Sequence, residues 1–319
     1  MEERGWMKGG GLEVDHERMA FLRQKFNDWA YGYEDTVEKV SIQSSFNLYS
    51  AARAHKASKI LEVGAGCGLA ARIFISYLMK KHCSFFVSDI SEKMNEIFVQ
   101  RFLETDTASD PEVKLVTLEE SDVIDVDQEI NNVEDNFLKR IFSCRANNEC
   151  LPFSDNSFDL YIACLSLMIV PNYKNQLTEA YRVVEEGGAA AFSVWGREEN
   201  CTMLTFVCEV FKEAGIEYTS GSTLTFKLSD KGFLIKDIKE VGFKEVKGFY
   251  TMTNPCFPTV NEAYDYSVSS ANAQLSLKNC TSEEREHLKL TFYQMYEERY
   301  GNDTSELMSW ETLVIIATK

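Results

Sequence analysis

Basic residues are scarce in this 319-residue sequence, which has 33 lysines and arginines against 50 aspartates and glutamates and a formal net charge of −17. Binding to a nucleic-acid backbone needs clustered lysine and arginine, and the sequence shows no such cluster. The same deficit disfavours binding to an anionic membrane surface. We therefore expect no nucleic-acid partner and no membrane partner.

Long hydrophobic runs and histidines are also few. The longest apolar run, residues 161–170, is much shorter than the roughly 20 residues that span a bilayer, and the first residues lack the pattern of a signal peptide. The four histidines are not spaced with cysteines as zinc ligands are, so no metal site is expected. Nine cysteines without a C-x-x-C pair are typical of reduced thiols in a cytoplasmic protein.

Three closely spaced glycines form the feature around which the rest of the sequence can be understood. The apolar run 60–63 predicts a buried strand, and residues 69–79 predict a helix. Between them lie Gly64, Gly66 and Gly68. A strand, a glycine turn and a helix in this order let a nucleotide-sized ligand approach bare backbone. A tight turn without a ligand is the alternative interpretation.

The residues around these glycines indicate the charge of the ligand. The dinucleotide fingerprint requires its third glycine at the position of Leu69, so this sequence departs from it. Glu62, two residues before the first glycine, would repel a pyrophosphate but suits a positively charged ligand. A nicotinamide-dependent dehydrogenase is therefore disfavoured.

A second acidic residue lies at the end of the next predicted strand, residues 84–89. Asp89 follows Gly66 by 23 residues (89 − 66 = 23), close to the roughly 20-residue separation of a carboxylate that binds ribose hydroxyls. The alternative role for Asp89 is to cap the following helix, but Ser91 already supplies an N-cap. We therefore expect Asp89 to bind a ribose.

Two stretches resemble a known family. Residues 62–68, Glu-Val-Gly-Ala-Gly-Cys-Gly, resemble the first motif of the class I S-adenosylmethionine (SAM) dependent methyltransferases, whose cofactor carries an ammonium and a sulfonium but no phosphate. Residues 145–163 are similar to the segment that runs from the adenine contact into the fourth strand of the ubiquinone- and menaquinone-biosynthesis-type small-molecule methyltransferases. The resemblance implies that the Asn147 side chain bonds the adenine amino group and that Asn148 offers its backbone N–H. It also implies cofactor contacts from Glu62, Gly64, Ala65, Gly66, Gly68, Asp89, Ile90 and Leu165.

The segment 1–54 is expected to form a helical lid. Apolar residues from Met19 to Trp29 recur at helical spacing. In methyltransferases of this type such a segment folds over the cofactor, and an aromatic residue often lines the pocket. We assign Tyr33 to the cofactor and Trp29 to the substrate, with packing of the helix on the sheet as the open alternative for both.

The resemblance implies an α/β fold for residues 55–319. The expected Rossmann-like sheet has seven strands in the order 3-2-1-4-5-7-6, with the last strand antiparallel, helices on both faces and helical cap additions. The acidic residues 104–136 are expected to form a solvated insertion, with a possible short strand at 113–116. Residues 258–300 form a predicted helical insertion that either covers the active site as a lid or packs in the core.

The function implied by the resemblance is SAM-dependent methyl transfer to an oxygen, nitrogen or carbon nucleophile of a small molecule. Leu165, Met168 and Trp195 make a partly apolar substrate the favoured prediction, with Met168 and Trp195 as substrate contacts. No residue has a motif that assigns it as the catalytic base. A SAM-binding regulatory partner without turnover and a protein or tRNA methyltransferase remain alternatives, and the oligomeric state is left open.

Overall fold

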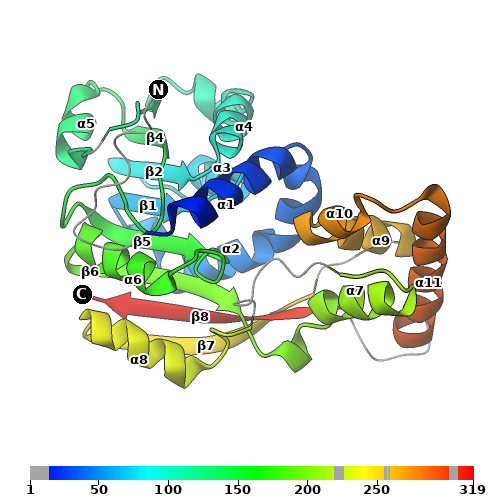
Figure 1. Ribbon diagram of the computed structural model, residues 1–319. Helices are drawn as coiled ribbons and strands as arrows, with labels where there is room; N and C mark the ends of the chain where they lie inside the picture. Colours follow the sequence, from blue (N-terminus) through cyan, green and yellow to red (C-terminus); the bar gives the residue numbers. More distant parts are fainter. Residues whose placement is uncertain (1–13, 122, 219–225, 255–256, 258, 302–307) are drawn as a thin grey trace.

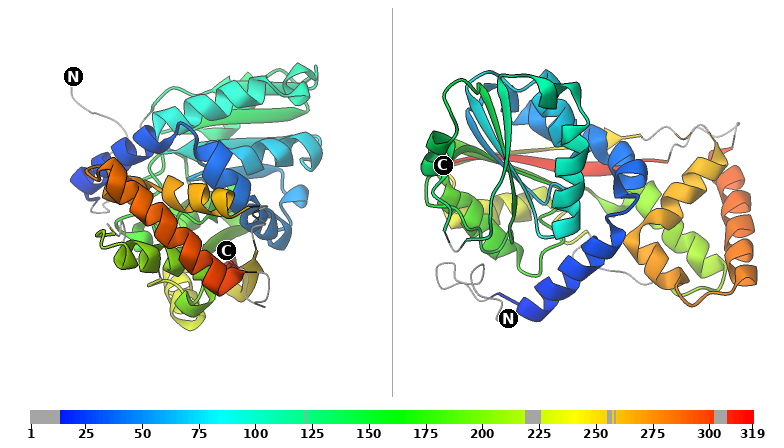
Figure 2. Two further views of the ribbon diagram at one scale, coloured as in Figure 1. Left: turned by 90° about the vertical axis from the view of Figure 1, so that its right-hand side faces the viewer. Right: turned by 90° about the horizontal axis from the view of Figure 1, so that it is seen from above.

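The computed structural model describes residues 14–121, 123–218, 226–254, 257, 259–301 and 308–319. The predicted segments 1–54, 104–136 and 258–300 therefore lie partly outside the described residues. The described chain folds around one mixed sheet, with a group of helices beyond one end of it (Figures 1 and 2).

The sheet has eight strands within the described residues, in the order β3-β4-β2-β1-β5-β6-β8-β7. Their bounds are β1 Lys59–Val63, β2 Cys83–Asp89, β3 Val113–Thr117, β4 Lys139–Arg145, β5 Phe158–Cys164, β6 Val184–Trp195, β7 Glu245–Thr253 and β8 Trp310–Thr318. The strand pairs from β3 through β4, β2, β1 and β5 to β6 are all parallel. β8 runs antiparallel to both β6 and β7.

The prediction of seven strands was wrong, because the described sheet has eight. The possible short strand at 113–116 is present as β3, whereas β4 was not predicted. Residues Val113–Thr117 pair in parallel with β4, starting at Val113 opposite Lys139. This pairing satisfies the backbone groups along the outer edge of β4. The strand order consequently differs from the predicted one by an additional edge strand, while the other seven strands follow β4-β2-β1-β5-β6-β8-β7.

The helices fall into three groups. Their bounds are α1 His16–Trp29, α2 Lys39–Ala51, α3 Leu69–Tyr77, α4 Glu92–Leu103, α5 Val126–Asn132, α6 Tyr173–Val183, α7 Thr202–Glu213, α8 Lys231–Val241, α9 Val260–Ser269, α10 Ala271–Leu277 and α11 Ser282–Tyr300. Helices α2, α3 and α4 share one core cluster with strand residues such as Ile60, whereas α6 and α8 share another with strand residues such as Leu61. Neighbouring strand residues alternate between the two clusters because a strand points successive side chains to opposite faces.

A third cluster forms a cap beyond the sheet. It joins α7, α9, α10 and α11 through buried side chains such as Phe206, Leu277 and Phe292, together with Trp310 at the start of β8. The view from above shows this cap beside the sheet, with α1 and α2 in the space between them (Figure 2). The helices on both faces of the sheet and the helical cap confirm that part of the predicted architecture.

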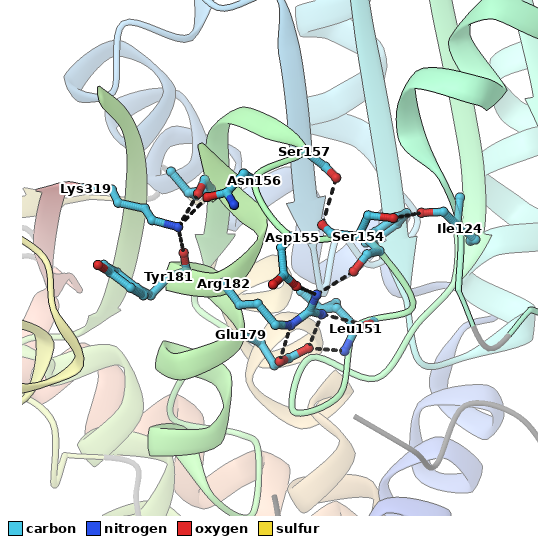
Figure 3. Close-up of polar contacts among 12 residues, drawn as sticks. Ile124, Leu151, Ser154, Asp155, Asn156, Ser157, Glu179, Tyr181, Arg182 and Lys319 are labelled. Atoms are coloured by element: carbon cyan, nitrogen blue, oxygen red, sulfur yellow. Dashed lines mark hydrogen bonds and ion pairs between the residues drawn. The ribbon is translucent and has the colours of Figure 1, made fainter. Parts of the chain in front are cut away.

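The connection between β4 and β5 is fixed to α6 by a buried ion pair (Figure 3). The Arg182 guanidinium donates to Glu179 at 2.8 and 2.7 Å, to the Leu151 carbonyl at 3.0 Å and to the Phe153 carbonyl at 2.6 Å. Glu179 also accepts the Leu151 N–H at 2.7 Å. These bonds hold the connection that carries the two asparagines predicted to contact adenine.

Candidate functional site

The glycine turn between β1 and α3 has a backbone that favours glycine at each of its three positions. Gly64, Gly66 and Gly68 have φ values of +61°, +62° and +70°, in the left-handed region that other residues rarely adopt. A Cβ on Gly66 would lie 2.7 Å from Glu38 Oε1 and 2.8 Å from Tyr33 Cε1. The turn is thus closely covered by the N-terminal segment.

Glu38, which follows Tyr33 in a short π-helical turn, Glu34–Glu38, occupies the N-terminus of α3. Its two carboxyl oxygens accept the N–H groups of Gly68 at 3.0 Å and Leu69 at 3.1 Å. These are donors that a helix leaves without an internal partner. A pyrophosphate would need the same donors and would meet the carboxylate, so the turn does not suit a dinucleotide. Burial raises the pKa of Glu38 to about 8.

Two further buried carboxyl groups flank the turn. Asp89 accepts the Gly66 N–H at 3.0 Å and the Ser91 N–H at 2.9 Å, and burial raises its pKa to about 6. The Ser91 hydroxyl accepts from Met94 N, which confirms Ser91 as the N-cap of α4. Glu62 accepts the Tyr49 hydroxyl at 2.8 Å, and burial raises its pKa to about 7.

These carboxyl groups line a cavity of about 710 Å³. Of the fourteen predicted site residues, the cavity brings together Trp29, Tyr33, Glu62, Gly64, Ala65, Gly66, Asp89, Ile90, Asn148, Leu165, Met168 and Trp195. Gly68 and Asn147 lie outside its lining. The remaining wall is mostly apolar and comes from α1, α7, α9 and the chain after β5. A site of this size and composition suits a small organic ligand.

Asn147 is arranged differently from the expectation. Its side-chain oxygen accepts the Glu149 N–H at 2.9 Å, so that oxygen is already engaged by the backbone. The buried amide nitrogen has no hydrogen-bond partner within the described part of the chain, and it is the group left to contact a ligand. Asn147 and Ile90 line a second, much smaller cavity, and Ile90 also lines the main one.

The residues that follow β5 show a strained turn at the cavity wall. Leu165 has a φ of +50°, unusual for a side chain of this size. Its N–H is held by the carbonyl of Ser193 at 3.0 Å and by the Ser193 hydroxyl at 3.1 Å. Next to it, the buried Ser166 hydroxyl lines the cavity without a partner among the residues described. An unpaired buried hydroxyl is costly, so Ser166 is suited to bind a ligand.

The aromatic residues assigned to the pocket also pack. Trp29 donates its ring N–H to the Ser269 carbonyl at 2.8 Å, and its ring lies 4.7 Å from that of Tyr33. Trp195 lies 5.5 Å from Trp310. Lining the pocket and packing against other side chains are therefore not exclusive roles. Each of the three predicted aromatic residues lines the cavity and also contacts another ring.

Several polar residues of the cavity were missed by sequence reasoning, among them Lys25, Glu38 and Ser166. A signal existed for Lys25, because a lysine interrupts the apolar spacing of the first predicted helix. Neither Glu38 nor Ser166 belongs to a local motif. Among the described residues, no group of histidine, cysteine, aspartate and glutamate could hold a metal ion, and no helix there is long and apolar enough to cross a membrane.

Two family models match the chain. One, described as "Methyltransferase domain", matches residues 61–192, and the other, "Hypothetical methyltransferase", matches residues 134–257. The ubiquinone/menaquinone biosynthesis C-methyltransferase UbiE of Brucella canis is 51% identical over 43 residues, which are 14% of this chain and 16% of that protein. The chain thus aligns with less than a fifth of this relative's length.

Solved methyltransferases share the fold. One belongs to a complex with the Haloferax volcanii Trm112 methyltransferase activator and has a TM-score of 0.51 at 15% identity, over 93% of this chain and 96% of that chain. The Haemonchus contortus phosphoethanolamine N-methyltransferase 2, in complex with S-adenosylhomocysteine, has a TM-score of 0.50 at 14% identity, over 92% and 60%. At these identities the likeness extends to the fold alone.

Proposed function

We infer that this chain, a class I SAM-dependent methyltransferase, transfers a methyl group to a small, partly apolar molecule bound in the cavity at its glycine turn. The observation that carries this proposal is that one cavity of the described chain contains both most of the predicted cofactor residues and an extensive apolar wall. When bound, SAM supplies a methyl group activated by its sulfonium. The chain itself has to hold the acceptor in line and exclude water.

The polar groups of the cavity fit this cofactor. Burial raises the pKa values of Glu38, Glu62 and Asp89, and a cationic ligand bound beside them would favour their ionised forms. We assign Asp89 to the ribose hydroxyls and Glu62 to the positive charge. The unpaired amide nitrogen of Asn147 is assigned to an acceptor atom of the adenine ring, which reverses the direction of the bond expected from the sequence.

The remaining predicted contacts complete the cofactor assignment. Gly64, Ala65 and Gly66 offer bare backbone, and Ile90, Asn148 and Leu165 line the same cavity. Gly68 does not contact the cofactor in this proposal, because its N–H donates to Glu38. It shapes the turn instead. Trp29, Met168 and Trp195 are assigned to the acceptor.

The cavity wall also bears on the acceptor's chemistry. No histidine is among the lining residues of the described chain, and the three carboxyl groups at the glycine turn accept hydrogen bonds from backbone N–H groups or from Tyr49. An acceptor atom that is already unprotonated at neutral pH needs no general base. Such an acceptor is the one this cavity supports best.

A small acceptor is favoured because several elements surround the cavity. We propose that residues 1–54 and 258–300 cover a methyltransferase domain formed by residues 55–319, with residues 104–136 as an insertion. Trp29 and Lys25 of α1 bond Ser269 and Asn272 at the α9–α10 junction. These bonds join the two covering segments to each other. A tRNA or protein acceptor would have to displace these contacts.

The test is calorimetric titration with SAM, S-adenosylhomocysteine and NAD, followed by methyl transfer to panels of metabolites, tRNA and proteins. We expect micromolar binding of both sulfur ligands, no binding of NAD, and transfer to a metabolite. Transfer to tRNA or protein alone would refute the small-molecule assignment. Failure to bind either sulfur ligand would refute the whole proposal.

One observation favours a second candidate, a protein that binds SAM without turnover. The described lining residues include no histidine, and the carboxyl groups of Glu38, Glu62 and Asp89 already accept hydrogen bonds. Cofactor binding at micromolar affinity together with no transfer to any panel would support this alternative.

A further inference from the structure

Helix α1 contributes an apolar stripe to the cavity with one charge in its middle. Four apolar residues of α1 line the cavity: Met19, Leu22, Phe26 and Trp29. Lys25 lines it too, and lies one helical turn from Trp29 and three residues from Leu22, on the same face of the helix. A lysine on a face that is otherwise buried and apolar needs a partner for its charge.

The structure shows one partner for this ammonium, and it is a neutral one. Lys25 Nζ donates to the Asn272 side-chain oxygen of α10 at 2.9 Å. An ammonium has three donors, so this bond leaves capacity for further acceptors. Burial lowers the pKa of Lys25, with the nearby Arg18 as a second cause. A hydrogen-bond acceptor that bears a negative charge would offset both causes of the lowered pKa.

A purely structural role explains this lysine poorly. Trp29, four residues along the same face, already bonds α1 to the Ser269 carbonyl at 2.8 Å. A bond to Asn272 could also be made by an uncharged side chain, without the cost of partly burying a charged ammonium group.

The distribution of charge in the cavity is uneven. The carboxyl groups of Glu38, Glu62 and Asp89 gather at the glycine turn, whereas Lys25 faces the cavity from α1 beside α10. Two other charged residues line the cavity, Glu198 and Lys227, which are both exposed and opposite in sign. The protein as a whole carries a net charge of −17, so an anion would be attracted into this cavity only by a local cation.

We propose that Lys25 binds a carboxylate on the acceptor, so that the substrates are small carboxylic acids with an apolar body. The body packs against the apolar stripe of α1 and the wall formed by Met168 and Trp195. This inference rests on the proposed function, because it takes the rest of the cavity as the cofactor site. It assigns a specificity-determining residue and leaves the methyl acceptor atom to the reaction assay.

The experiment measures binding, so it does not depend on turnover. The protein loaded with S-adenosylhomocysteine is titrated with 2-naphthaleneacetate, 2-naphthaleneacetamide and 2-naphthaleneethylamine, which share one apolar body and carry charges of opposite sign or none. We expect the acid to bind about tenfold more tightly than the amide, as one charge-assisted hydrogen bond provides, and the amine to bind most weakly. The Lys25→Met variant should bind acid and amide equally, whereas Lys25→Arg should keep the preference.

The Asn272→Ala variant separates recognition from tethering. It removes the bond to Lys25 but leaves the ammonium, so we expect it to keep the preference for the acid. If Lys25 only tethers α1, Lys25→Met and Asn272→Ala will lower the melting temperature alike and leave the ratio of the acid and amide dissociation constants unchanged. That result would overturn the inference.

The remaining outcomes are also decisive. Equal binding of acid and amide to the wild-type protein, or binding of none of the three probes, would refute an apolar acid as the substrate class while leaving cofactor binding intact. A preference for the acid in a protein that binds neither SAM nor S-adenosylhomocysteine would refute the proposed function but support the carboxylate site.

Discussion

Binding of SAM should release protons from the three carboxyl groups at the glycine turn. Burial raises the pKa values of Glu38, Glu62 and Asp89 to about 8, 7 and 6. A cation bound beside them favours their ionised forms. The protein with bound SAM therefore holds fewer protons than the free protein between about pH 6 and pH 8, and the affinity for SAM should rise with pH across this window.

The size of the effect follows from the same values. At pH 7, Glu62 with a pKa of about 7 is about half protonated, so its complete ionisation releases about 0.5 proton. If Glu38 and Asp89 ionise as well, the total is about 1.5 protons. Each proton released corresponds to about a tenfold rise in affinity per pH unit, or about 1.4 kcal/mol.

Calorimetry in buffers of different ionisation enthalpy measures the number of protons directly. The control ligand is 5′-methylthioadenosine, which lacks both the sulfonium and the ammonium and should release fewer protons. Glu62→Gln is the matched variant, because its amide oxygen can still accept the Tyr49 hydroxyl, and it should lose about 0.5 proton of the release. Equal proton release with both ligands, or uptake of protons on SAM binding, would refute the claim that the positive charge of SAM favours ionisation of these carboxyl groups.

Three substitutions test the polar contacts around the cavity. Asp89→Asn places an amide N–H₂ against one of two backbone donors, so SAM affinity should fall by about 10- to 100-fold in a calorimetric titration; an unchanged affinity would remove Asp89 from the cofactor site. Glu38→Ala leaves the Leu69 N–H of α3 without its carboxyl acceptor, whereas the Gly68 N–H keeps the Ala65 carbonyl at 3.1 Å. It should lower the free energy of unfolding by about 1–3 kcal/mol in urea, and an unfolding curve that coincides with the wild-type curve would contradict this. Arg182→Met leaves the buried Glu179 carboxylate without its cation and should destabilise by about 2–3 kcal/mol. The control Lys93→Met removes a surface ion pair with Glu96 and should leave the unfolding curve unchanged; equal effects would show that the ion pair does not hold the β4–β5 connection.

Local patterns in the sequence predicted the local parts of the site. The glycines of the turn could be placed because a strand, the turn and a helix are contiguous in the chain. Asp89 and Ser91 could be placed because each lies within a few residues of the strand end or helix start that it serves. In each case, one short segment fixes both the residue and its partner.

Contacts between distant segments could not be predicted in this way. Glu38 caps a helix that begins about 30 residues later, and no spacing rule connects them. A strand at 113–116 was expected, but its place at the edge of the sheet depends on pairing with β4, a distant strand that was not predicted. The orientation of the Asn147 side chain is fixed by the Glu149 N–H, which donates to its side-chain oxygen.

The cavity is assembled from more of the chain than the part that resembles other methyltransferases. The matched domain, residues 61–192, contains Glu62, the glycines, Asp89 and the asparagines, which are the groups assigned to the cofactor. Lys25, Trp29 and Trp195 lie outside it, and so do the walls formed by α7 and α9. Apart from Met168, the residues proposed to contact the acceptor thus lie on either side of the matched domain.

This division explains why resemblance can identify the cofactor without identifying the substrate. The cofactor presents the same groups to every member of the family, so the residues that bind it recur in recognisable motifs. The acceptor differs among enzymes, and in the function proposed for this chain it would contact an N-terminal helix and a C-terminal cap that Trp29 and Lys25 join. Its specificity would then follow from the charge and shape of those elements, and the half-buried Lys25 is the cation of α1 that lines the cavity.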